Sequence, residues 1–85
     1  MEAYKLLAQI MIKQGKIDDT LEMLTDIAQK NENGDIYYLM AKIFEMNEDY
    51  NSQKDCLELA LNFQGTLTFS IGSIQEELKK IKLDS

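Results

Sequence analysis

The chain repeats one pattern of residue types at a spacing of 33 positions, and this feature limits its fold more than any other. The first copy reads Tyr4-x-x-Leu7-Ala8-x-x-Met11, followed by Thr20-x-x-x-Leu24. The second copy reads Tyr37-x-x-Met40-Ala41-x-x-Phe44, followed by Gln53-x-x-x-Leu57. Periods of about 20–50 residues are typical of arrays in which each unit packs on its neighbours. The sequence therefore predicts two stacked units of one design.

Hydrophobic residues within each unit follow the period of an α-helix. The clearest stripe is Ile17, Leu21, Leu24, Ile27 and Ala28. The chain has no proline and only four glycines, which favours uninterrupted helices over a turn-rich β fold. We expect helices over residues 3–13, 17–30, 36–46 and 50–63. Gly15 should take the left-handed conformation after the first, and Asp35 should be the N-cap of the third.

The last 20 residues differ from both units. Residues 66–69 are expected to be an extended loop, and a fifth helix, capped by Ser70 or Ser73, should end near Leu83. Its hydrophobic stripe is narrow, as suits a helix that caps an array. We expect one all-α domain over residues 1–85. It divides into a first unit (1–34), a second unit (35–65) and a loop with the capping helix (66–85).

These units resemble the tetratricopeptide repeat (TPR), a helix–turn–helix unit. The resemblance implies a TPR-like α–α superhelix of two antiparallel helical hairpins plus a capping helix. It also implies that Ala8 and Ala41 lie where helices cross closely, and that Leu7 and Met40 fill the core of their units. Neither unit ends in the family's usual proline.

Three other interpretations compete with this one. The first, which stays open, is a plain helical bundle whose similarity to the TPR is accidental. Pentatricopeptide hairpins bind RNA, but their unit is longer than 33 residues and the net charge of −6 is wrong for RNA. The two-carboxylate clamp of chaperone-binding members of the TPR family agrees only at Lys5, because Gln9 and Leu39 stand where that clamp has asparagines.

Composition excludes several classes of function. With a net charge of −6 we expect no nucleic-acid partner. No stretch has the length of a membrane span, and the first residues lack the pattern of a signal peptide, so we expect a cytoplasmic protein. A lone cysteine, Cys56, agrees with a reducing compartment. Without histidine, the usual parts of zinc sites and of Ser–His or Cys–His catalysis are missing. We expect no enzyme activity, no cofactor and no metal.

In TPR arrays the first helix of each unit lines a concave groove, and the resemblance carries this role to nine residues here. They are Lys5, Leu6, Gln9, Ile12, Lys13, Tyr38, Leu39, Lys42 and Glu45. Their spacing of three or four places them on shared helix faces. Lysines beside apolar side chains predict a site for a peptide or helix with apolar anchors and carboxylates. The other open interpretation is that these lysines are the solvated face of two amphipathic helices.

A second hypothesis starts from the first expected helix, which is apolar nearly all round. Ends of repeat arrays normally carry a polar cap, and an uncovered apolar surface favours association. The chain could therefore be a self-associating structural module, either a homodimer or part of a larger repeat array. A groove binder should lose its ligand on Lys5→Glu or Lys42→Glu, whereas an assembly module should change its oligomeric state on Ile10→Glu.

Overall fold

Five helices form the chain in a computed structural model that describes residues 3–63, 65 and 67–84. They are α1 (Ala3–Lys13), α2 (Ile17–Lys30), α3 (Gly34–Met46), α4 (Tyr50–Asn62) and α5 (Ile71–Asp84). No strand occurs among the described residues, so the all-α prediction is confirmed. The predicted helix ends differ from the observed ones by one or two residues at most. Within the same residues, no helix combines the length and apolarity that a membrane crossing needs.

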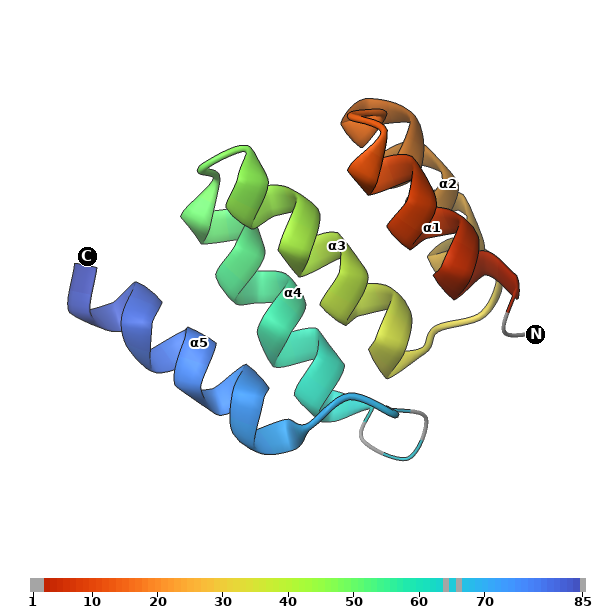
Figure 1. Cartoon of the computed structure of the whole chain (residues 1–85). Coiled ribbons are helices and arrows are strands. Elements are labelled where there is room, and N and C mark those ends of the chain that lie inside the picture. Colours follow the sequence, from red (N-terminus) through yellow and green to blue (C-terminus); the bar gives the residue numbers. More distant parts are fainter. Residues whose placement is uncertain (1–2, 64, 66, 85) are drawn as a thin grey trace.

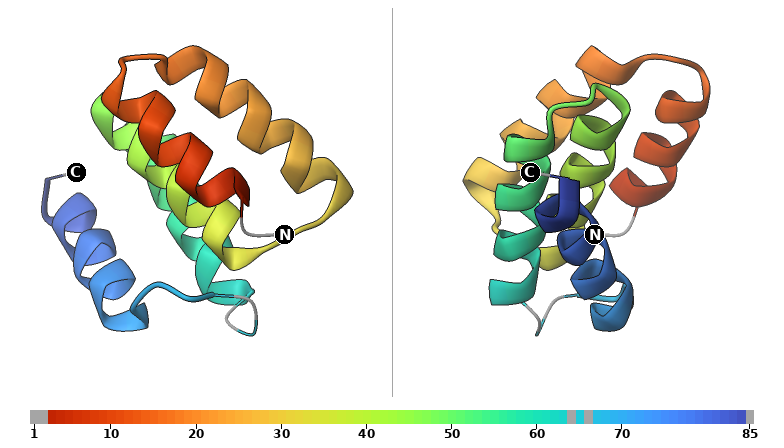
Figure 2. Two further views of the ribbon diagram at one scale, coloured as in Figure 1. Left: turned by 45° about the vertical axis from the view of Figure 1, so that its right-hand side comes forward. Right: turned by 90° about the vertical axis from the view of Figure 1, so that its left-hand side faces the viewer.

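The helices form two antiparallel hairpins and a final helix (Figure 1). Helices α1 and α2 make the first hairpin, α3 and α4 make the second, and α5 packs against α4 (Figure 2). Helix α3 touches α1, α2 and α4, so it is the central element. The molecule measures 33 × 29 × 19 Å, and its smallest dimension fits two layers of helices.

Helix α3 is buried on two sides. On one side Ile36, Leu39 and Ile43, which are only 0–4% exposed, pack with Ala8 of α1 and with α2. On the other side Tyr38 and Ala41 pack with α4 and α5. The cluster there is completed by Cys56, Leu57, Ala60 and Ile74. Burial on two sides explains why the sequence of α3 is apolar nearly all round.

The turns inside the two hairpins have the same backbone geometry. Gly15 has a φ of +83°, and the N–H of Lys16 donates to the carbonyl five residues earlier at 2.9 Å. At the positions 33 residues later, Glu48 has a φ of +59°, and Asp49 makes the equivalent bond at 2.9 Å. A left-handed residue followed by this bond is a common helix ending. The repeat in the sequence is therefore also a repeat of backbone conformation.

The start of α3 differs from the prediction. Asn33, not Asp35, is the N-cap, because the Asn33 side chain accepts a hydrogen bond from the N–H of Asp35 at 2.8 Å. The helix begins earlier than predicted, at Gly34, which lies against the end of α4. A Cβ at this position would be 2.7 Å from the carbonyl oxygen of Phe63. Glycine permits this close approach, and the side chain of Asp35 turns inward instead of capping.

The structure also decides the positions of Leu7 and of the residue that caps α5. Leu7 does not fill the core: it is 48% exposed, whereas its neighbour Ala8 is fully buried and occupies the inward face of α1. Of the two candidate caps for α5, Ser70 accepts a hydrogen bond from the N–H of Ser73 at 3.4 Å. Ser70 therefore stands at the start of α5.

The shared turn geometry predicts opposite effects at two equivalent positions. Glu48→Gly should raise the free energy of unfolding by about 1 kcal/mol, because glycine adopts the left-handed conformation without steric cost. Gly15→Ala should lower it by about 1 kcal/mol, although a Cβ there would meet no atom within 4 Å. Urea denaturation of both variants checks this. A loss of stability in Glu48→Gly would show that the Glu48 side chain stabilises the fold by more than its left-handed backbone conformation costs.

Candidate functional site

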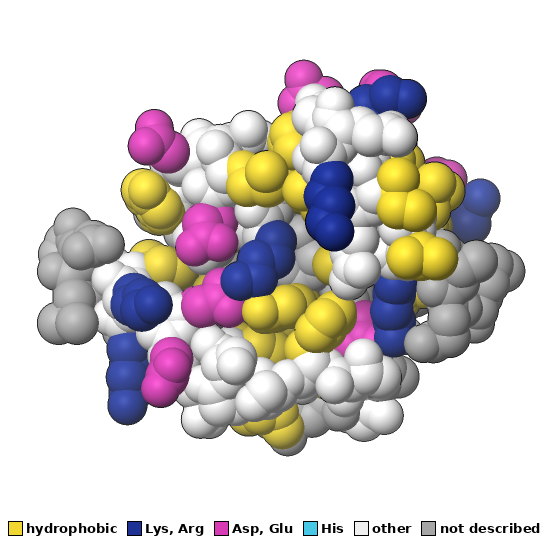
Figure 3. All heavy atoms as spheres, in the orientation of Figure 1, with side chains coloured by type: hydrophobic (Ala, Val, Ile, Leu, Met, Phe, Trp, Pro, Cys, Tyr) yellow, Lys and Arg dark blue, Asp and Glu magenta, His cyan; other side chains and the backbone are white. Residues whose placement is uncertain are grey.

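One hollow between α1 and α3 brings together seven of the nine predicted site residues. Its volume is about 390 Å³. The seven are Gln9, Ile12 and Lys13 of α1 with Tyr38, Leu39, Lys42 and Glu45 of α3, and Met46 and Phe69 complete the lining. We call this hollow the α1–α3 groove. Figure 3 shows a hollowed face where hydrophobic side chains lie beside lysine and acidic side chains. The volume is in the range of small-ligand sites in proteins.

The other two predicted residues lie elsewhere. Leu6 is 64% exposed and is not part of the groove lining. Lys5 also lies outside that lining, and its ammonium group forms an ion pair with Asp35. Its positive charge is thus compensated within the protein. Lys5→Glu would place a second carboxylate beside a buried one, so this variant cannot serve as a clean test of ligand binding.

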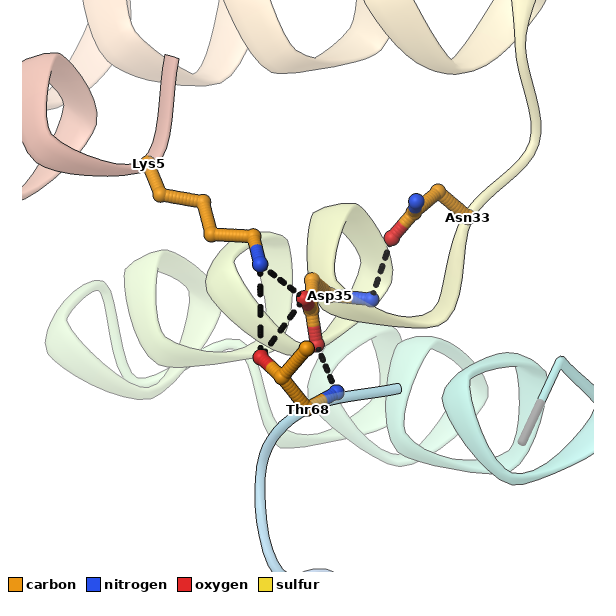
Figure 4. A network of polar contacts seen from close by, with 4 residues as sticks. All are labelled: Lys5, Asn33, Asp35 and Thr68. Atoms are coloured by element: carbon orange, nitrogen blue, oxygen red, sulfur yellow. Dashed lines mark hydrogen bonds and ion pairs between the residues drawn. The ribbon is translucent and has the colours of Figure 1, made fainter. Parts of the chain in front are cut away.

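Asp35 is the buried centre of a polar network that joins α1, α3 and the segment before α5 (Figure 4). Its carboxylate accepts hydrogen bonds from the backbone N–H of Thr68 at 2.7 Å and from the Thr68 hydroxyl at 2.8 Å. Lys5 pairs with the same carboxylate and also donates to the Thr68 hydroxyl at 3.3 Å. The side chain of Asp35 is only 1% exposed. The network therefore fixes the segment that carries Phe69 beside the groove.

The contacts of Asp35 keep it charged. Burial alone would raise the pKa of this carboxyl, but the hydrogen bonds from Lys5 and Thr68 outweigh burial and hold the pKa below its usual value of 3.8. A buried carboxylate of this kind is stable only with its partners. Its role in the fold is therefore to join three segments, and it is not placed to react with a ligand in the groove.

A second polar cluster forms the side of the groove nearest α5. The hydroxyl of Tyr38 donates to Glu77 Oε2 at 3.0 Å, and Lys42 Nζ donates to the same oxygen at 3.1 Å. The ring of Tyr38 also packs on Phe69, with centroids 4.5 Å apart. Burial alone would lower the pKa of Lys42, but its bonds to Glu77 and Tyr38 raise the pKa above its usual value. Lys42 is therefore protonated at neutral pH.

A second hollow adjoins the α1–α3 groove on the side of α5. Its volume is about 500 Å³, and it shares Tyr38, Lys42 and Glu45 with the groove. Its remaining lining comes from α4 and α5 and includes Gln53, Ser73 and Lys80. The cluster of Tyr38, Lys42 and Glu77 thus stands between two hollows. A ligand longer than one or two side chains could cross from one to the other.

Sequence reasoning missed two groove residues for different reasons. Met46 follows Leu39 and Lys42 at helical spacing on α3, so periodicity alone could have included it. Phe69 lies in the segment before α5, and no local pattern places that segment beside α1. Its position depends on the bonds of Thr68 to Asp35, which is 33 residues away.

No group of three or more metal-ligating side chains occurs among the described residues. The thiol of Cys56 is buried, and burial, together with Asp55 and Asp49, raises its pKa to about 11. The thiol is therefore protonated at neutral pH and is a poor nucleophile.

Comparison of this chain with protein-family models, with curated proteins and with solved structures finds no match. The interpretation of the groove therefore depends on the residues and contacts described above.

The lowered pKa of Asp35 predicts a specific loss of stability in acid. Because the folded state holds this proton less tightly than the unfolded state, the stabilisation is complete well above pH 3.8 and is lost as the pH falls through that value and below. Asp35→Asn should be about 3 kcal/mol less stable at pH 7, and the difference should shrink toward pH 3. Chemical denaturation at a series of pH values gives the free energy of unfolding of the original chain and of Asp35→Asn.

A matched double variant tests whether the pairing causes this effect. Asp35→Asn removes the carboxylate that pairs with Lys5 in the hydrogen-bonded network, so adding Lys5→Met to that variant should recover part of the lost stability. If Lys5→Met instead adds its own independent loss, the two side chains are not coupled.

Proposed function

We propose that this chain is a TPR-like, non-catalytic protein–protein interaction module that binds a short peptide or helix in the α1–α3 groove. An adaptor or scaffold protein in the cytoplasm would use such a module. One observation carries the proposal: seven residues selected from the sequence as groove-lining line a single hollow. The two hairpins with equivalent turns support the TPR-like superhelix.

The groove favours a ligand that is mainly apolar. Ile12, Met46 and Phe69 supply apolar surface, and side chains at i and i+3 or i+4 of a bound helix would fill such a site. Of the three lysines predicted to line the groove, Lys5 is paired with Asp35 and Lys42 with Glu77. Lys13 is exposed at the rim. We therefore expect apolar anchors to supply most of the affinity and one carboxylate near Lys13 to add to it.

Selection of short random peptides from a displayed library against the immobilised chain tests this function. Selected peptides should carry two apolar residues three or four positions apart and an acidic residue. Met46→Glu, which places a charge at an exposed position of the groove lining, should weaken their binding at least about tenfold. Lys13→Glu should weaken only the acidic peptides.

The control for both variants is Gln29→Glu, which adds one carboxylate on the exposed outer face of α2. In fluorescence anisotropy with labelled peptides, Gln29→Glu should bind with the same affinity as the unaltered chain. Peptides that bind Met46→Glu as tightly as the control would place the binding site outside the groove.

A specific observation also favours a second function, assembly through α1. Leu6, Leu7 and Ile10 are 64%, 48% and 43% exposed, and they lie within one turn of each other on α1. We call these three side chains the α1 patch. Contiguous exposed apolar side chains often mark interaction surfaces.

Light scattering across a concentration series separates the two forms of this second hypothesis. A homodimer should show twice the monomer mass of 9.8 kDa at high concentration and return to monomer on Ile10→Glu. A chain that serves as part of a larger array should stay monomeric by itself at every concentration.

A further inference from the structure

The α1 patch has counterparts in the second unit, and there the same positions are covered. Leu6, Leu7 and Ile10 correspond at the 33-residue offset to Leu39, Met40 and Ile43 of α3. On α3, Leu39 and Ile43 are 4% and 0% exposed, and they pack against the hairpin of α1 and α2. On α1, the equivalent Leu6 and Ile10 are 64% and 43% exposed. The same face of the repeat is therefore closed in one unit and open in the other.

Helix α5 repeats this mode of packing at the other end. Its side chains at the same relative spacing are Glu77, Leu78 and Ile81, all partly buried. Leu78 and Ile81 pack against the cluster formed by α3 and α4. The contact residues Ile74, Leu78 and Ile81 of α5 have the same spacing as Ile36, Met40 and Ile43 of α3, which pack on the first hairpin. Each of these two helices uses this face to pack on the hairpin that precedes it in the chain.

From this equivalence we infer that the α1 patch is a stacking surface for a further helical hairpin, which packs on α1 as the first hairpin packs on α3. The occupant is a partner hairpin whose surface resembles the one that Ala8, Leu24 and Ala28 present to α3. Small residues at the crossing let the helices approach closely. Aliphatic residues around them would cover Leu6 and Ile10. This inference concerns a surface outside the α1–α3 groove and does not depend on ligand binding there.

The fold gives a reason to prefer a hairpin over a second copy of this chain. A second copy would have to offer an open hairpin surface, but α3 occupies that of the first hairpin and α5 occupies that of the second. If two copies met through the same patch, the contact would be α1 against α1. That pairing involves three apolar side chains on a helix of 11 residues, which is little for an interface that normally buries about 1,200–2,000 Å².

The inference can be tested with an extended chain in which a second copy of residues 1–33 directly precedes Met1. The added hairpin is the probe, and the 33-residue register of the sequence continues through it. We expect the thermal midpoint of the extended chain to lie roughly 5–10 °C above that of the original chain, because the added hairpin covers the α1 patch. Circular dichroism follows the melting of both chains.

Ile10→Glu in the original α1 separates stacking from a general gain in stability. In the original chain its effect should be within about 2 °C, since Ile10 lies at the surface. In the extended chain it should remove most of the gain. Gln29→Glu on the outer face of α2 is the matched control and should leave the gain intact.

Three results would overturn the inference. One is an extended chain that aggregates or melts no higher than the original. Another is an equal effect of Ile10→Glu in both chains. The third is an original chain that is dimeric in light scattering and becomes monomeric on Ile10→Glu, which would assign the patch to a second copy. Peptide binding in the groove is measured separately, so failure of either hypothesis leaves the other standing.

Discussion

The two-sided burial of α3 is the constraint on which the rest of the structure depends. Ile36, Leu39 and Ile43 need cover on one side, and Tyr38 and Ala41 need it on the other. A hairpin before α3 and the pair of α4 and α5 after it supply this cover. The groove follows from the same arrangement, because Leu39 and Tyr38 lie at the two edges of the buried faces and, although nearly buried, line the hollow between α1 and Phe69.

The network of Asp35 then fixes what hydrophobic packing leaves free. Apolar contacts tolerate small shifts of one helix along another, whereas a buried carboxylate with charged and neutral donors requires each donor in place. Lys5 comes from α1, and Thr68 lies just before α5, so one side chain of α3 sets the positions of both neighbours. The cost is that Lys5 no longer offers its charge to a ligand.

Much of the fold could be predicted from the sequence, because helix ends and repeats produce patterns among residues that are near one another in the sequence. The left-handed turn at Gly15 and the 33-residue spacing required only the chain's own residues, whereas the place of Ala8 was implied by the resemblance to the TPR. The site is harder to predict from the sequence than the fold. A stripe of lysines on a helix looks the same whether its charges are free or paired, and Asp35, the partner of Lys5, has the sequence context of a helix N-cap. Leu7 was misplaced because α1 is apolar on nearly every side, so periodicity could not say which face turns inward.

The groove and the α1 patch are separate surfaces, although both involve α1. Gln9, Ile12 and Lys13 face α3 and the groove, whereas Leu6, Leu7 and Ile10 lie on the exposed side of the same helix. A hairpin stacked on the patch would therefore leave the groove open. It would also set a first helix of its own beside α1, as α1 lies beside α3, and so lengthen the concave face. If the groove binds a long ligand as proposed, its affinity should therefore depend on whether a hairpin occupies the α1 patch.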